Sequence, residues 1–201
     1  DVRKNLLRMG LEMAVEPRSR AFLLNYINSE KPKKRIRCTE KIGWHASQFV
    51  LPNKVFGRST GEEVVFQGNA CQGYTHSGNL QEWAKNVAEP CQGHHMLVSI
   101  LCFAFAPPLL ALTGEENGGL HLVGPSSIGK TIALKIAASV WGNPGLNGFM
   151  HKWRATVNGL EAIAESRNDS LLILDEIGEI SPKDAGLAVY MLGNGTGKRR
   201  A

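Results

Sequence analysis

The stretch GLHLVGPSSIGKTIALKIAASVWG, residues 119–142, decides the fold class of this chain. Its middle part, GPSSIGKT at 124–131, fits the phosphate-loop pattern G-x-x-x-x-G-K-[ST]. The residues GLHLV before the loop predict a short buried strand, and the residues after it predict a helix with Ile132, Ile136 and Val140 on one face. Because strand, loop and helix in this order are the context that a phosphate loop requires, we expect a nucleotide site rather than a simple glycine turn.

The residues of this loop have separate expected tasks. Backbone N–H groups of a glycine-rich loop point at phosphate oxygens, and the new helix adds its positive end. Gly129 is expected where the backbone passes close to phosphate, Lys130 at the β- and γ-phosphates, and Thr131 at Mg²⁺. The predicted nucleotide-binding residues are Gly124, Pro125, Ser126, Ser127, Ile128, Gly129, Lys130 and Thr131.

A second motif, DSLLILDEIGEI at 169–180, supplies matching acids. Its apolar run 171–174 predicts a parallel strand buried on both faces, and ligands bind beyond the carboxyl ends of such strands. We therefore expect Asp175 to hold Mg²⁺ together with Thr131, and Glu176 to act as the general base that positions water. Lys130 and Glu176 are the predicted catalytic residues, and ATP and Mg²⁺ the predicted cofactors.

The rest of the chain indicates two regions. From residue 119 onward strands alternate with helices, which indicates a parallel α/β sheet. These helices include 159–167, capped by Asn158, and one that is capped by Ser181 and begins at Pro182. Residues 35–67 read as short strands after two helices, 2–15 and one capped by Ser19, and 68–79 has linker composition. We predict an α/β P-loop core at 80–201 and a smaller, β-rich α+β accessory region at 1–79.

Composition and charge indicate which partners and which cellular location to expect. The formal net charge of +5 permits nucleic acid as a partner without requiring it. The basic run KPKKRIR at 31–37 reads as a phosphate-contacting patch or as a solvated loop, and we favour the loop because no aromatic residues interrupt the run. The chain opens without a secretory signal, and Pro107 and Pro108 interrupt its longest apolar run. We expect a cytoplasmic protein with no membrane span.

Two weaker alternatives concern other side chains. The residues Cys71, His76, Cys91, His94 and His95 admit a zinc site, although their spacing is not that of a standard finger. Arg154 and Thr156 lie before a predicted helix, where they would approach the nucleotide or a neighbouring subunit, or belong to a solvated loop.

Several blocks in order carry a resemblance to a known family. The blocks are GWHASQFVLPNKVFG, LQEWAKNVA, GGLHLVGPSSIGKTIALKIAASVWGNP, WRATVNGLEAIAE, LLILDEIGEI and YMLGNGTGKRRA. Together they resemble the P-loop ATPase domain of a bacterial family once catalogued as of unknown function and described as superfamily-two-helicase-like. The resemblance implies an additional-strand P-loop ATPase fold and a helicase-like role in replicating the DNA of phages, plasmids and genomic islands. It also implies a ring-forming homo-oligomer and a primase partner.

The family's motifs fall on named residues of this chain. Gly124, Gly129, Lys130 and Thr131 match its Walker A motif, and Asp175 and Glu176 its Walker B motif. The later blocks that carry a sensor residue and an arginine finger do not appear before Ala201, so we expect a fragment of a longer protein.

These observations predict a motor or switch that binds and hydrolyses Mg-ATP in the replication of a mobile genetic element. A module that binds nucleotide or DNA and assists assembly without turnover is the first alternative, because the family includes inactivated derivatives. A small-molecule phosphotransferase is the second, and the paired acids after the apolar strand argue against it.

Overall fold

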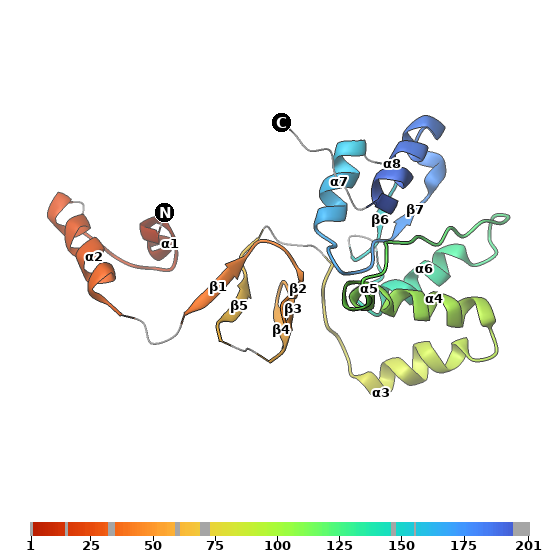
Figure 1. The fold of residues 1–201 in the computed structure, drawn as a ribbon, viewed down its shortest axis with the longest axis horizontal. Helices are drawn as coiled ribbons and strands as arrows, with labels where there is room; N and C mark the ends of the chain where they lie inside the picture. Colours follow the sequence, from red (N-terminus) through yellow and green to blue (C-terminus); the bar gives the residue numbers. More distant parts are fainter. Residues whose placement is uncertain are drawn as a thin grey trace. The chain divides into compact units, whose positions relative to one another are not determined.

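A computed structural model describes residues 2–14, 16–31, 35–58, 61–68, 73–145, 148–154 and 156–194 (Figure 1). The chain divides into two compact units, Asp1–Arg35 and Ile36–Ala201. The end of the last resemblance block, 195–201, and the zinc candidate Cys71 lie outside the described residues.

The first unit consists of two helices, α1 (Val2–Arg8) and α2 (Pro17–Ser29). The first helix is shorter than predicted, and Gly10 follows it with a left-handed φ of 96°. The prediction that Ser19 caps the second helix is wrong, because Pro17 already occupies the first turn and Glu16 is the capping position. Proline fits there because its fixed φ suits the first helical residue and its missing N–H has no partner to lose. Neither helix contains a buried residue.

The second unit begins with two small sheets, so the β-rich texture expected for 35–67 is confirmed. Strand β1 (Ile36–Thr39) pairs in parallel with β5 (Glu63–Phe66). Strands β2 (Gly43–His45), β3 (Gln48–Leu51) and β4 (Lys54–Gly57) form an antiparallel meander. The strands are short and separated by turns, as the frequent Gly, Pro, Asn and Ser in this region predict.

Strand β2 is bonded to residues that come much later in the chain. The backbone N–H of Trp44 donates to Asp169 Oδ2 at 2.8 Å, and its indole Nε1 donates to the Pro108 carbonyl at 2.8 Å. Asn168 Nδ2 donates to the Ile42 carbonyl at 3.0 Å. These bonds join the two sides of the predicted division between 1–79 and 80–201, and a separate role for each side stays a prediction.

Helices form most of the remaining structure and its main core. A helical stretch comprises α3 (Leu80–Trp83), a π-helix (Ala84–Ala88) and a 3-10 turn (Glu89–Cys91), and α4 (His95–Phe105), α5 (Pro107–Thr113) and α6 (Lys130–Ala138) follow it. Among the described residues no single helix is long and apolar enough to cross a membrane, and α4 with α5 pass that test only as a pair bent by 57°. The main core contains Ile42, Tyr74, Ile100, Ala104, Ala133, Ala137, Ala138, Phe149, Leu171 and Ile173.

The buried face of α6 differs from the predicted one. Ala133 and Ala137 are buried, whereas Ile132 is 63% exposed. The small alanine side chains let α6 lie close to α4, whose Ile100 and Ala104 belong to the same core. The face predicted from Ile132 and Ile136 is therefore one residue away from the face that packs, which contains Ala133 and Ala137.

The strand expected at 119–123 is absent, and Leu120 and Val123 are exposed. A strand needs a hydrogen-bonded neighbour, and within the described residues none pairs with this segment. The parallel pairing near the second motif joins β6 (His151–Lys152) to β7 (Leu174–Asp175). Strand β7 is shorter than the apolar run, although Leu171 and Ile173 are buried as expected.

The last helices are α7 (Val157–Glu165) and α8 (Pro182–Asn194), with a 3-10 turn (Ile177–Glu179) after β7. The prediction that Asn158 caps the first of them is wrong, because the Thr156 side chain accepts from the Gly159 N–H at 3.2 Å. The cap at Ser181 is confirmed, since its Oγ accepts from the Asp184 N–H at 3.2 Å. Trp153, Leu160 and Ala188 form a second, smaller core beside these helices.

Candidate nucleotide site

The predicted phosphate loop turns sharply before α6. Ser127 and Gly129 have left-handed φ values of 65° and 92°, and Ile128 between them does not. Such alternation turns successive N–H groups toward one side and makes an anion-binding concavity. A Cβ on Gly124 would meet only the end of the exposed Ile128 side chain, which would have to shift to make room for it. The backbone therefore has a shape that suits phosphate oxygens.

Lys130 is the first residue of α6, and its ammonium folds back over the loop. Its Nζ donates to the Gly124 carbonyl at 2.8 Å and to the Pro125 carbonyl at 2.6 Å. The two carbonyls hold the cationic head beside the loop, where an incoming anion would meet it. Pro125, Ser126 and Ser127 are exposed at this place.

Thr131 and Asp175 meet although they are 44 residues apart. Thr131 Oγ1 donates to Asp175 Oδ2 at 3.1 Å, which joins the start of α6 to the carboxyl end of β7. A hydroxyl and a carboxylate are oxygen donors of the kind that Mg²⁺ takes. The structure thus brings the two predicted magnesium ligands together, and their binding of the metal stays a prediction.

Glu176, the predicted general base, follows directly after β7 in an uncommon backbone conformation. Its φ of 61° is left-handed, which is rare for a residue with a long side chain. Its N–H donates to Asp175 Oδ1 at 2.9 Å, which supports the turn. The turn directs the side chain toward solvent, where it is about half exposed.

Lys152 binds this carboxylate and was not anticipated from the sequence. Its Nζ lies 2.5 Å from Glu176 Oε2 and 3.5 Å from Glu179 Oε1. The β6–β7 register places Lys152 opposite Asp175, which brings the ammonium to the acids. No local pattern around Lys152 signals this role, because strand β6 has two residues and its partner acids lie more than twenty positions later.

The ion pair favours the charged form of both partners. The hydrogen bond from Lys152, aided by one with Glu179 and by the lysine's charge, holds the pKa of Glu176 below its ordinary value. The hydrogen bond to Glu176 raises the pKa of Lys152. Both groups are therefore ionised at neutral pH, so Glu176 is in the protonation state that a general base requires.

The weaker candidates make no hydrogen bond or ion pair with these site residues in the part of the chain that the structure describes. Thr156 caps α7, and Arg154 is exposed. Within the described ranges there is no group of three or more His, Cys, Asp or Glu side chains that could hold a metal, so His76, Cys91, His94 and His95 give the zinc alternative no support there.

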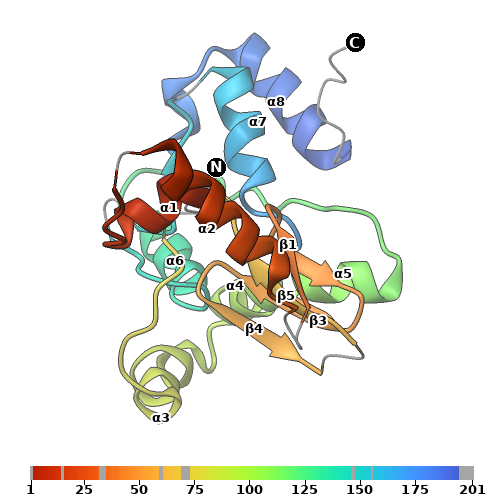
Figure 2. The same cartoon turned by 90° about the vertical axis from the view of Figure 1, so that its left-hand side faces the viewer.

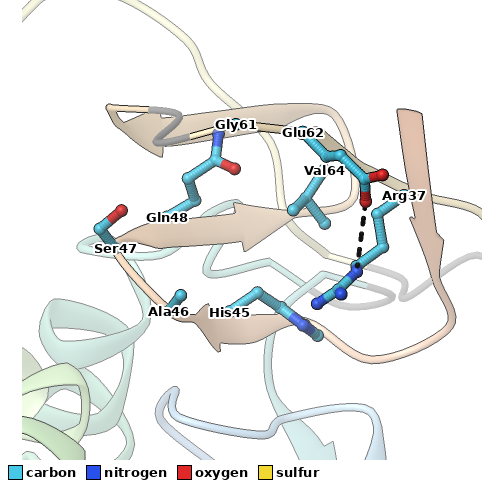
Figure 3. Close-up of a pocket in the computed structure, with 8 residues that line it drawn as sticks. All are labelled: Arg37, His45, Ala46, Ser47, Gln48, Gly61, Glu62 and Val64. Atoms are coloured by element: carbon cyan, nitrogen blue, oxygen red, sulfur yellow. Dashed lines mark ion pairs between the residues drawn. The ribbon is translucent and has the colours of Figure 1, made fainter. Parts of the chain in front are cut away.

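The second unit also contains a pocket away from the phosphate loop, and this pocket is too small to hold a nucleotide. It has a volume of about 190 Å³ and is lined by Arg37, His45, Ala46, Ser47, Gln48, Gly61, Glu62 and Val64 (Figure 3). Ligand pockets typically measure about 300 to 1,000 Å³. Arg37 Nε pairs with Glu62 Oε2 across it at 3.9 Å, and none of the predicted site residues lines it.

Comparison with known proteins places the chain in a family. The solved structure described as "SCCmec type IV Cch - active helicase" matches with a TM-score of 0.69 and 22% identity, over 90% of this chain and 37% of that chain. At this identity the likeness shows the fold alone: a mixed α/β arrangement of small parallel sheets and helices similar to that of a helicase. No curated protein matches the sequence. The model of a family described as "Domain of unknown function (DUF927)" matches residues 1–201, and this chain therefore belongs to the DUF927 family.

Proposed function

We propose that this chain is the Mg-ATP-binding core of a helicase-like P-loop ATPase that serves the replication of a mobile genetic element. The hydrogen bond between Thr131 and Asp175 carries the proposal. It gathers two motifs that are far apart in sequence at the end of β7, where α/β sheets bind ligands. A glycine turn with a merely structural role would not need an acid at this place.

The fold likeness to Cch, a protein described as an active helicase, supports the helicase-like part of the proposal. Because the chain spans 37% of that chain, turnover is proposed for the full-length protein rather than for this chain by itself. The proposed polymer is nucleic acid, with DNA first. A homo-oligomer and a primase partner follow from the sequence resemblance.

The proposed mechanism assigns one task to each residue. The loop amides at 124–131 and the start of α6 bind the β- and γ-phosphates, and Lys130 exchanges its two carbonyl partners for phosphate oxygens. Thr131 and Asp175 hold Mg²⁺, which supplies neutralisation of the charge on those oxygens. The Glu176 carboxylate orients water and accepts its proton.

The nucleotide site is tested by thermal unfolding of this chain with and without Mg-ATP. Ligand that binds the folded state alone stabilises it by about 2.7 kcal/mol at a hundredfold excess over Kd. We expect the melting temperature to rise, and the rise to vanish in Lys130→Ala. Lys135→Ala is the matched control, because this lysine is exposed on the same helix and its side chain makes no hydrogen bond or ion pair with any described site residue. An unchanged melting temperature in the parent chain would overturn the proposal.

Binding without turnover is the second candidate function, and one observation favours it. Lys152 engages the Glu176 carboxylate that has to orient water. Phosphate release by the full-length protein, measured with and without single-stranded DNA, separates the two functions. Release that Glu176→Gln abolishes supports the ATPase, whereas ATP binding without any release supports an assembly module. Phosphate transfer to a nucleoside or a sugar, with no response to DNA, would indicate the phosphotransferase.

A further inference from the structure

The net positive charge of this protein comes entirely from its first unit. Residues 1–35 contain nine lysines and arginines against four acidic residues, which accounts for the whole net charge of +5. Residues 36–201 contain fourteen of each kind and are neutral. The division between the two compact units at Arg35 coincides with this change in charge.

Helix α2 of the same unit exposes aromatic rings beside a cation. Arg18, Phe22 and Tyr26 recur every four residues and share one face, which Asn25 and Ser29 complete. Phe22 is 74% exposed and Tyr26 55% exposed, whereas Leu23 and Ile27 on another face are partly buried. Figure 2 shows this helix in the first unit. Contiguous exposed apolar side chains mark interaction sites more often than single ones do.

We propose that this face of α2 binds single-stranded nucleic acid, a proposal that rests on the proposed function for the class of polymer. Unpaired bases stack on Phe22 and Tyr26, and Arg18, Lys31 and Arg35 contact phosphates. Asn25 and Ser29 carry the amide and hydroxyl groups that hydrogen-bond base edges. The rings on α2 supply the aromatic component that the basic run itself lacks.

Charge favours nucleic acid over a second copy of the chain as the partner of this face. A polyanion complements the excess of five positive charges, whereas the second unit of another copy is neutral. Two copies of the first unit would repel each other. The strand has to be single, because the bases of a duplex are already stacked on one another and are not available to the rings.

Fluorescence anisotropy with a labelled oligothymidine and the full chain tests the proposal. Stacking is worth about 1 to 3 kcal/mol per base, so Phe22→Ala with Tyr26→Ala, which removes two rings, should weaken binding by about thirtyfold or more. Leu24→Ala is the matched control, because this residue is 59% exposed on another face of the same helix and should leave affinity unchanged. Phe22→Tyr with Tyr26→Phe keeps both rings and should bind as the parent does.

Three results would overturn the proposal: no binding by the parent chain, equal affinity for a duplex of the same length, or a double alanine variant that binds as tightly as the parent. Loss of a dimer in that variant, seen by light scattering with DNA affinity unchanged, would assign the face to a second copy instead. Measuring the Mg-ATP effect on the melting temperature in the same samples keeps the proposals separable. If Mg-ATP raises the melting temperature but the chain does not bind DNA, only this inference is contradicted. If the chain binds DNA but Mg-ATP leaves the melting temperature unchanged, only the nucleotide site is contradicted.

Discussion

At the scale of single residues, the ion pair between Lys152 and Glu176 sets the charge state of the proposed catalytic centre. A carboxylate with a lowered pKa keeps its charge to lower pH than an ordinary glutamate, whose value is 4.5. Its stabilising contribution is present above that ordinary value and disappears as pH falls through the lower, folded-state value. Both side chains are about half exposed, so the effect on stability is small and the effect on titration is the better measure.

Removing the lysine should restore an ordinary titration. We expect the pKa of Glu176 to rise in Lys152→Met, because the variant loses both the hydrogen bond and the positive charge. Carboxyl carbon-13 NMR across a pH series, with Glu176→Gln to assign the signal, measures the shift. Lys152→Arg keeps the charge and should keep the pKa low. A titration that is the same in Lys152→Met and in the parent would contradict the role given to this pair.

His151 is the neighbouring residue in β6 and makes stability depend on pH. Burial, and then the charge of Arg167, lowers its pKa from 6.5. Arg167 Nη2 lies 3.0 Å from His151 Nε2, and because arginine only donates, this nitrogen accepts as neutral imidazole. The unfolded chain binds a proton below about pH 6.5 that the folded chain does not, so stability is lost as pH falls through that value.

We therefore expect the melting temperature to fall as the pH is lowered from 8 to about 5.5, and His151→Gln to reduce that slope. Glutamine offers an uncharged acceptor to Arg167 and does not titrate. Thermal unfolding monitored by circular dichroism in matched buffers provides the measurement. An equally steep slope in the variant would assign the effect to other groups.

At the scale of elements, the attachment of β2 depends on the turn at 168–169. Asp169 has a left-handed φ of 50°, which asparagine also adopts readily and alanine does not. Gly43 lies against it, and a Cβ there would collide with the Asp169 carboxylate. The turn therefore serves two purposes, because its backbone reverses the chain and its carboxylate receives the Trp44 N–H.

Substitutions at Asp169 should separate these two purposes. Asp169→Ala leaves the partly buried Trp44 N–H without its acceptor, which costs about 1 to 3 kcal/mol of unfolding free energy. Asp169→Asn keeps an acceptor and the left-handed preference, so most of that loss should be avoided. Urea unfolding followed by tryptophan fluorescence gives both values. Equal stability in Asp169→Ala and the parent would show that this bond contributes nothing to the unit.

The elements also show which parts of the fold were predictable. The helix after the phosphate loop and the cap at Ser181 carry their signals within a few residues, so local chemistry was sufficient. The Thr156 cap was missed because both Thr156 and Asn158 are good caps and the sequence does not say where the first turn begins. The strand predicted at 119–123 is absent because an apolar composition does not tell whether a neighbouring strand is available for hydrogen bonding. Lys152 was missed because its role depends on the register between two segments that are distant in the sequence.

At the scale of the whole molecule, the two units differ in charge and in burial. Neither helix of the first unit has a buried residue, whereas the second unit contains both apolar cores. Lys31 and Arg35 are exposed at the end of the first unit. Exposed basic residues at a boundary between units are preferred sites of proteolysis.

Limited digestion with trypsin should therefore cut first after Arg35. We expect one stable product that begins at Ile36 and is nearly neutral at pH 7, identified by mass spectrometry. Arg35→Gln should slow its appearance while other cuts proceed as before. Early cleavage after Lys130 or Lys135 instead would mean that the second unit opens more readily than its cores suggest.

The bonds that attach β2 have a consequence for biosynthesis. Trp44 and Asp169 are 125 residues apart, so a ribosome adding about 5 to 20 residues per second makes the acceptor roughly 6 to 25 seconds after the donor. Over that interval the meander exists without Asn168 and Asp169, which bind it. The Trp44 N–H and the Ile42 carbonyl bind water or a chaperone until then, so slower translation of 45–168 would prolong the period in which this sheet can pair with wrong partners.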